Sequence, residues 1–146
     1  MRYFEKVIAV KTIGASNYKV RLTAYIPDQI LENENQQARP AVLILPGGGY
    51  ERTSKREAEP VAMRFVSEGL CAFVLDYSIA PARFPQALCE ALSAASYIRE
   101  NAKDWQIDPH KIAVRGFSAG GHLAASVGIF WNQEWLKSYL KIEADQ

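Results

Sequence analysis

The stretch KIAVRGFSAG, residues 111–120, joins an apolar run to a G-x-S-x-G pentapeptide, and an apolar, Gly/Ala-rich run over residues 119–130 follows it. A serine between a strand and a helix in this pattern sits on a sharp turn, with its hydroxyl projecting above the edge of the sheet. Side chains at Gly116 and Gly120 would collide with so tight a backbone. The stretch therefore predicts a strand, a turn carrying Ser118 as a nucleophile, and a helix whose first amides favour negative charge beside it.

The pentapeptide alone is a weak signal, because serine is also common at the N-cap of an ordinary helix. A second indication is the segment Pro46-Gly47-Gly48-Gly49-Tyr50, which follows the apolar run 41–45. A dinucleotide-binding fingerprint needs a glycine three residues after Gly49, where Arg52 stands, and a P-loop needs a Gly-Lys-Ser/Thr ending that is absent. Two interpretations remain: a plain glycine turn, and an oxyanion loop in which consecutive glycines let backbone N–H groups point toward the serine.

The chain as a whole alternates apolar runs with helical patterns, which predicts an α/β fold with a mostly parallel sheet and helices on both faces. Strands are expected over residues 41–45, 71–76 and 111–117, and helices over residues 59–68, 85–101 and 119–130. A turn signal at 14–17 predicts that two earlier strands, 6–12 and 18–27, pair in antiparallel fashion. Further expected features are an exposed loop over 28–39, a turn at 108–110 and a polar, partly helical tail over 131–146.

The composition describes an ordinary globular chain, which we treat as a single domain over residues 1–146. Its 17 Lys and Arg against 16 Asp and Glu leave a net charge of +1 without a basic block, so no nucleic-acid partner is expected. No apolar run approaches the roughly 20 residues of a spanning helix, and no signal peptide is recognised, so we expect no membrane partner and a cytoplasmic location. Cys71 and Cys89 fit reduced, buried thiols. No metal or cofactor is implied.

Four segments together resemble α/β-hydrolase esterases, in particular acetyl-esterase and lipase-like members of the hormone-sensitive-lipase type: residues 46–50, 76–81 with 84–85, 108–114, and 116–124. The resemblance extends from about Pro40 to Gly128. It implies an α/β-hydrolase fold and a serine hydrolase that cleaves small-molecule carboxylic esters, with small-acyl or carbohydrate-borne acetyl groups, through an acyl-enzyme on Ser118. It also implies that the amides of Gly48, Gly49 and Ala119 form the oxyanion hole.

Three aromatic residues near the same sheet edge, Tyr50, Tyr77 and Phe117, are candidates to line the acyl or alcohol pocket. Large aromatic residues in such positions also serve as plain packing. The residues themselves do not separate an esterase from a peptidase of the same fold. A non-catalytic fragment or a degenerate paralogue that only binds is the alternative from outside the enzymes.

The chain departs from the family pattern in three places. Pro46 replaces the histidine of the common H-G-G-G motif, which matters little because the amides carry the function of that loop. Arg115 is unexpected in an otherwise apolar strand, and we expect it to pair with a carboxylate at the strand end or to contact substrate. The family's acid and histidine follow the serine in chain order, yet the only histidines here are His110 and His122.

Neither histidine is expected to act as the general base. His110 belongs to a turn at the start of the strand that leads to Ser118, roughly 20 Å away, and His122 should lie inside the helix as a packing or hydrogen-bonding residue. Asp76 precedes the serine, and the resemblance makes it a structural residue. We therefore expect an incomplete domain whose acid, base and C-terminal strands lie outside residues 1–146. Its exposed sheet edge would allow the chain to form a homo-oligomer or to self-associate.

Overall fold

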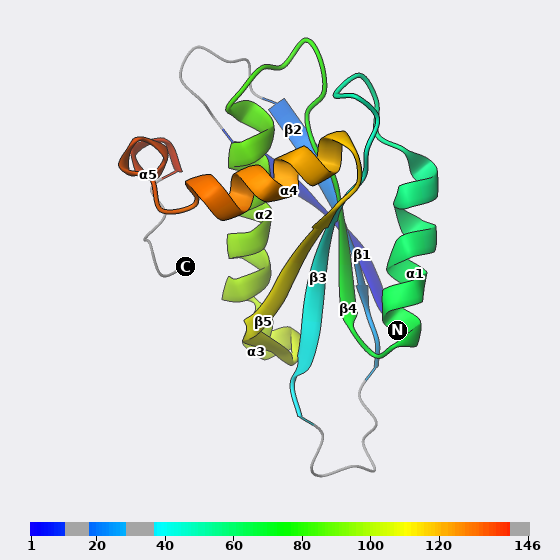
Figure 1. Ribbon diagram of the computed structural model, residues 1–146. Helices are drawn as coiled ribbons and strands as arrows, with labels where there is room; N and C mark the ends of the chain where they lie inside the picture. Colours follow the sequence, from blue (N-terminus) through cyan, green and yellow to red (C-terminus); the bar gives the residue numbers. More distant parts are fainter. Residues whose placement is uncertain (11–17, 29–36, 141–146) are drawn as a thin grey trace.

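The computed structural model describes residues 1–10, 18–28 and 37–140, and the side chains of residues 137–139 are outside this description. Within these residues the chain forms a five-stranded sheet from β1 (Arg2–Val10), β2 (Tyr18–Ile26), β3 (Arg39–Leu45), β4 (Cys71–Asp76) and β5 (Ile107–Gly116). The spatial order is β1-β2-β4-β3-β5; β2 is antiparallel to both of its neighbours, and β4, β3 and β5 are parallel. Strand β1 therefore runs in the direction of the three parallel strands. The predicted α/β fold is confirmed, with a sheet that is mixed because β2 is antiparallel to its neighbours (Figure 1).

Helices cover both faces of the sheet, as predicted. They are a 3-10 turn (Lys55–Glu57), α1 (Glu59–Ser67), α2 (Gln86–Glu100), α3 (Ala102–Trp105), α4 (Ala119–Phe130) and α5 (Glu134–Leu140). Helix α1 lies on one face, and α2 and α4 lie on the other (Figure 1). Side chains alternate along β3 because successive residues of a strand point to opposite faces. Val42 and Ile44 accordingly join the cluster under α1, and Leu43 and Leu45 join the cluster under α2 and α4.

Strand β5 begins earlier than predicted, because it absorbs the turn expected at residues 108–110. Its pairing with β3 jumps from Arg39↔Ile107 to Ala41↔Ile112, so one intervening residue of β3 faces a longer segment of β5. The turn chemistry is nevertheless present inside this irregularity. The carboxylate of Asp108 accepts a hydrogen bond from the backbone N–H of His110 at 2.9 Å, which is how an Asx turn forms. The irregularity lies at the end of β5 remote from Ser118.

The outer side of β5 is an open edge. Among the described residues β5 pairs only with β3, and its side chains at Ala113 and Arg115 are exposed, whereas Val42 and Ile44 of β3 are buried. The expected exposed edge is therefore present in this part of the chain. Unpaired N–H and C=O groups along such an edge can pair with another strand.

The two cysteines are free and buried, as predicted. Burial raises the pKa of each thiol to about 11, so both are protonated at neutral pH. None of the helices in the described residues is both long and apolar enough to cross a membrane. The same residues contain no group of three or more His, Cys, Asp or Glu placed to hold a metal ion.

Candidate active site

Ser118 stands on a strained turn between β5 and α4. Its backbone has φ 51° and ψ −119°, a conformation that residues with a side chain rarely adopt and that clusters at functional sites. The turn requires glycine at position 116, as predicted, because a Cβ atom there would lie only 1.9 Å from the carbonyl oxygen of Gly120. The Ser118 side chain makes no capping hydrogen bond, and the residue is exposed. The interpretation of Ser118 as a simple helix cap is therefore wrong.

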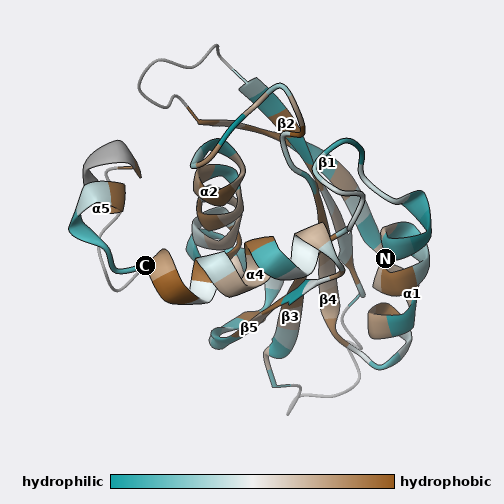
Figure 2. Ribbon diagram, turned by 45° about the horizontal axis from the view of Figure 1, so that its top comes forward, coloured by the Kyte–Doolittle hydropathy of each residue, from teal (hydrophilic) through white to brown (hydrophobic). Residues whose placement is uncertain are grey.

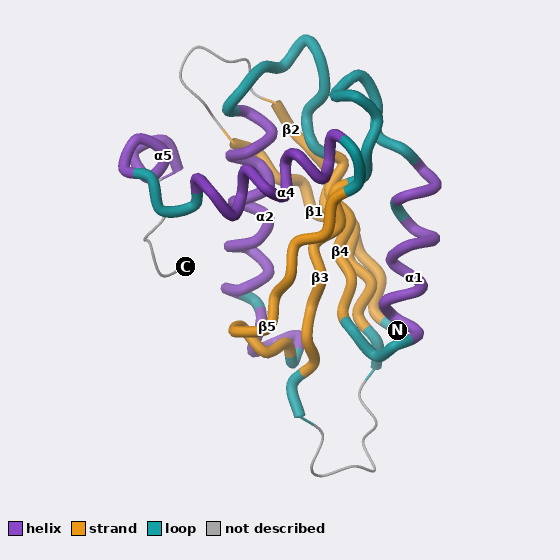
Figure 3. Tube along the Cα trace, viewed as in Figure 1, coloured by secondary structure: helices purple, strands orange, loops and turns teal. Residues whose placement is uncertain are grey.

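The glycine loop after β3 packs directly against this turn. A Cβ atom at Gly47 would lie 3.1 Å from the Cβ of Ser118 and 2.6 Å from the carbonyl oxygen of Phe117. Gly47 is fixed on both sides, because its N–H donates to the Glu57 carboxylate at 2.8 Å and its carbonyl accepts from the Ser54 N–H at 2.8 Å. Figure 3 shows the loops after β3 and β4 and the turn before α4 gathered at one edge of the sheet, where the parallel strands have their carboxyl ends.

Three backbone donors at this edge remain available. Gly48 has φ 140°, and a Cβ there would lie 2.1 Å from the carbonyl oxygen of Arg52, so the loop requires glycine at this position. Among the described residues, the N–H groups of Gly48, Gly49 and Ala119 have no hydrogen-bond acceptor. The Ala119 N–H is also the first amide of α4, where the helix dipole favours negative charge. Backbone N–H groups without an acceptor are the kind of donor from which an oxyanion hole is built.

Tyr77 supports the glycine loop from beneath. It is 2% exposed, and its hydroxyl donates a hydrogen bond to the carbonyl oxygen of Pro46. Burial, together with nearby negative charge, raises the pKa of Tyr77 to about 12, so the phenol remains a donor at neutral pH. The loop after β4 also donates directly, from the Ala80 N–H to the Tyr50 carbonyl at 2.6 Å. The buried position of Tyr77 assigns it to loop support rather than to substrate contact.

Asp76 contacts the segment that follows the glycine loop, at Thr53 and Lys55. Its carboxylate accepts from Thr53 Oγ1 at 3.0 Å, pairs with Arg21 at 2.9 Å and lies 3.6 Å from Lys55 Nζ. Burial by itself would raise the pKa of Asp76, but the hydrogen bonds from Arg21 and Thr53 and the nearby positive charges outweigh it and lower the pKa from 3.8. The interpretation of Asp76 as a structural residue is confirmed.

We expect the substitution Asp76→Asn to lower the free energy of unfolding by about 1–2 kcal/mol at pH 7. Because the folded-state pKa of Asp76 is depressed, this stabilisation is complete above the unfolded-state pKa and is lost as the pH falls through the folded-state value. Urea unfolding of both proteins between pH 7 and pH 2 measures the difference, which should shrink below about pH 4. The matched control Glu68→Gln removes an exposed pair with Arg64 and should change stability by less than about 0.5 kcal/mol.

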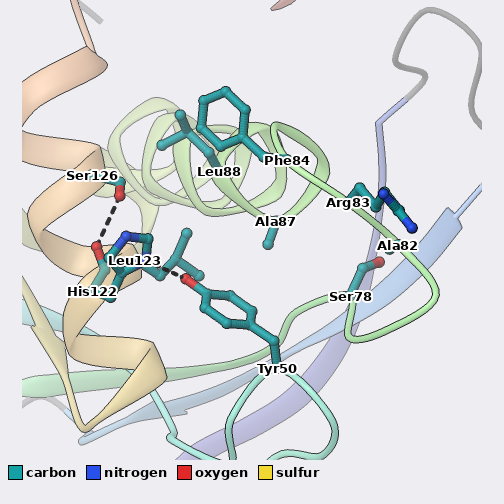
Figure 4. Close-up of a pocket in the computed structure, with 10 residues that line it drawn as sticks. All are labelled: Tyr50, Ser78, Ala82, Arg83, Phe84, Ala87, Leu88, His122, Leu123 and Ser126. Carbon is teal, nitrogen blue, oxygen red and sulfur yellow. Dashed lines mark hydrogen bonds between the residues drawn. The ribbon is translucent and has the colours of Figure 1, made fainter.

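A cavity of about 230 Å³ lies beside the glycine loop, between α2, α4 and the loop after β4 (Figure 4). Its lining is mainly apolar: Tyr50, Ser78, Ala82, Arg83, Phe84, Ala87, Leu88, His122, Leu123 and Ser126. Of the three predicted substrate-binding residues, Tyr50 lines this cavity, and Tyr77 and Phe117 do not. Ser118 is not part of the lining, which on α4 begins at His122, one helical turn further along the chain.

His122 is a hydrogen-bonding residue of α4, as predicted. Its Nδ1 lies 2.9 Å from the hydroxyl of Tyr50, and the two rings meet edge to face. The backbone carbonyl of His122 accepts from Ser126 Oγ at 2.9 Å (Figure 4). His110 lies at the opposite end of β5 from Ser118, in the irregular segment. The structure brings neither ring into a hydrogen bond with Ser118.

Phe117 and Arg115 lie on the face of the sheet that carries α1. Phe117 is half-buried against the hydrophobic cluster beneath α1, and it is absent from the lining of the cavity. The Arg115 guanidinium lies 5.2 Å from the centre of the Phe117 ring, a cation–π contact. The prediction that Arg115 pairs with a carboxylate is wrong within the described residues, where its guanidinium contacts the Phe117 ring and forms no ion pair.

The rim of the cavity is aromatic. Phe84 is 65% exposed, and its ring lies 6.0 Å from that of Phe130 and 5.8 Å from that of Trp135. Figure 2 shows that the C-terminal end of α4, next to this cluster, is hydrophobic. Ile129 and Trp131 at that end are more than half and about half exposed, respectively. This part of the surface therefore exposes several large apolar side chains.

The strand order, the turn that carries Ser118 between β5 and α4, and the parallel crossovers are those of an α/β-hydrolase, and solved structures agree. A carboxylesterase from Lactobacillus plantarum matches with a TM-score of 0.85 and 28% identity, over 100% of this chain and 52% of that one. An acetyl ester-xyloside bifunctional hydrolase from Caldicellulosiruptor lactoaceticus matches with a TM-score of 0.70 and 40% identity, over 76% of this chain and 39% of that one.

A family model described as BD-FAE matches residues 25–145, and the chain belongs to this family. The endo-1,4-beta-xylanase B of Butyrivibrio fibrisolvens is 34% identical over 113 residues, which are 74% of this chain and 18% of that protein. The chain thus spans less than a fifth of this curated relative and about half of the Lactobacillus esterase. The resemblance to esterases of the α/β-hydrolase fold is confirmed.

Proposed function

We propose that the chain carries the nucleophile and the oxyanion hole of a carboxylic ester hydrolase. The observation that supports this most directly is the strained, uncapped Ser118, packed against a glycine loop with available amides. The Ser118 hydroxyl oxygen would attack the ester carbonyl carbon, while the amides of Gly48, Gly49 and Ala119 receive the negative oxygen. The C–O bond to the alcohol then breaks, the alcohol leaves with a proton, and water hydrolyses the acyl-serine to a carboxylic acid.

The general base and its acid partner are proposed to lie outside residues 1–146. His122 is engaged by Tyr50 within α4, and His110 lies at the remote end of β5. The family pattern requires a base that takes the proton from Ser118 and delivers it to the leaving alcohol. A partner strand at the open edge of β5, from further sequence or from a second copy of the chain, would complete the sheet.

The proposed substrates are esters of small acyl groups, including acetyl groups on carbohydrates. The support comes from the names of relatives, which include an acetyl ester-xyloside hydrolase and a xylanase. Tyr50 is proposed to form the wall between the oxyanion loop and an apolar pocket for the acyl or alcohol group. An ester rather than a peptide substrate is favoured by the carboxylesterase among the structural relatives.

A fluorophosphonate probe tests the serine mechanism, because it reacts with activated serines. The protein from its native source is treated with the probe and digested, and both the labelled peptide and the intact mass of the labelled species are determined. We expect the label on the Ser118 peptide of a species larger than 16.3 kDa. A label on Ser118 at 16.3 kDa would contradict the external base, and no label on Ser118 in any species would overturn the proposed function.

A further inference from the structure

Glu90 is the only charged side chain that is buried among the described residues. It is 0% exposed, within the first turns of α2, and its carboxylate accepts three hydrogen bonds from neutral groups. Ser78 donates from its backbone N–H at 2.7 Å and from Oγ at 2.6 Å, and Gln86 donates from Nε2 at 2.7 Å. No Lys, Arg or His side chain of the described residues pairs with Glu90.

A buried carboxylate without a cation is costly, so this arrangement needs a reason. Removing a carboxylate from water costs several kcal/mol even after the protein relaxes, and the three donors offset that cost only if all are well placed. All three groups that meet Glu90 are donors, and a carboxylate accepts at both oxygens. A glutamine in the same place would keep only one acceptor oxygen for the hydrogen bonds that the two carboxylate oxygens now accept.

The segment that Glu90 holds is the one that supports the glycine loop. Tyr77, directly before Ser78, donates to the Pro46 carbonyl, and Ala80, two residues after Ser78, donates to the Tyr50 carbonyl at 2.6 Å. These two hydrogen bonds flank the glycines of the loop. Ser78 also lines the cavity (Figure 4). Glu90 is therefore linked to both sides of the glycine loop through one short segment, although it lies on a helix outside the site.

We propose that Glu90 is a positioning residue that fixes Ser78, and through residues 77–80 holds the glycine loop so that the amides of Gly48 and Gly49 face Ser118. The effect of Glu90 on the reaction at Ser118 rests on the proposed function, whereas its effect on the position of the glycine loop does not. Oxyanion donors are effective because they are held in place before the reaction. A displacement of about 1 Å at a reacting group can lower the rate by about a hundredfold.

Hydrogen–deuterium exchange tests the structural content in Glu90→Gln. We expect amides of residues 77–80 and 47–52 to exchange about tenfold faster or more, while amides of β4 and α1 change little. The matched control is Ser96→Ala, which removes a buried hydroxyl of the same helix that donates to Glu100 at 3.1 Å and not to the loop. A uniform change over the whole chain, or the same loop change in the control, would show that Glu90 is only a packing residue.

The variant Ser78→Ala removes one donor without placing a mismatched group in the core, so it tests the network if Glu90→Gln does not fold. It should accelerate exchange in both loops. Where Glu90→Gln does fold, adding Ser78→Ala to it should have little further effect, because both changes break one network. An unchanged loop in Ser78→Ala would overturn the proposal.

Fluorophosphonate labelling then separates this inference from the proposed function. It is carried out on the larger species that contains the proposed base, because residues 1–146 alone are not expected to react. If Ser118 is labelled in the unaltered protein, the labelling rate should fall at least about tenfold in Glu90→Gln and remain near the original rate in Ser96→Ala. Equal rates in the two variants would overturn the positioning role. If the unaltered protein is not labelled, the proposed function fails, and the exchange measurements alone decide whether Glu90 positions the loop.

Discussion

The substitution Gly120→Ala should lower the free energy of unfolding by about 3 kcal/mol. A Cβ atom at this position would lie 2.0 Å from the carbonyl oxygen of Leu45 and 2.7 Å from that of Pro46. Both atoms belong to backbone, so the overlap cannot be relieved by rotating a side chain. Helix α4 would have to move away from the end of β3, which would separate the turn that carries Ser118 from the glycine loop. A loss of this size is a large part of the 5–15 kcal/mol that stabilises a typical domain.

The control for this prediction is Gly128→Ala in the same helix. Nothing lies within 4 Å of a Cβ atom at Gly128, so only helix propensity changes, and stability should rise by about 0.5–1 kcal/mol. Urea unfolding followed by far-UV circular dichroism gives both values. The close approach of α4 to β3 would be contradicted if the two substitutions had similar effects on stability.

The elements of the fold were predictable because their signals are local. Strand β4 and helix α4 match the predicted residues, α1 ends one residue earlier, and α2 is one residue shorter at each end. Apolar runs, proline positions and terminal glycines are signals within each segment, so these elements could be predicted. The irregular pairing of β5 was not predictable, because the strand must first lie beside β3 for its register to be defined. The turn predicted at 14–17 lies outside the described residues.

The candidate site was predictable only in part. The spacing of the glycines predicts the turn at Ser118 and the glycine loop. The roles of Tyr50 and Tyr77 depend instead on which distant residues their hydroxyl groups contact. The pairing of Tyr50 with His122 joins residues 72 positions apart. Glu57 and Glu90 were not singled out from the sequence at all. A signal for Glu90 existed, because it lies on the helix 85–101 at four residues from Gln86, among positions that the helical pattern expects to be buried.

The substitutions Ser118→Ala and Ser118→Gly should both abolish labelling by the fluorophosphonate probe, a loss of at least about ten-thousandfold in rate. Their effects on stability should differ. Ser118 holds φ 51° and ψ −119°, which costs a residue with a side chain about 1–3 kcal/mol and costs glycine little. Alanine keeps the Cβ atom and therefore the strain, so Ser118→Ala should leave stability near its original value. Ser118→Gly should raise it by about 1 kcal/mol.

The substitution Gln106→Gly is a control that relieves backbone strain at a position away from the candidate site. Gln106 ends α3 with φ 54° and ψ 45°, a left-handed position that glycine favours, and it lies at the far end of β5 from Ser118. This variant should gain up to about 1 kcal/mol in urea unfolding and keep its labelling rate. An equal gain in Ser118→Ala and Ser118→Gly would assign the effect to loss of the hydroxyl rather than to the backbone. The expected pattern is that only glycine at position 118 raises the free energy of unfolding. It would mean that the strained turn, which exposes the Ser118 side chain, lowers the stability of the fold.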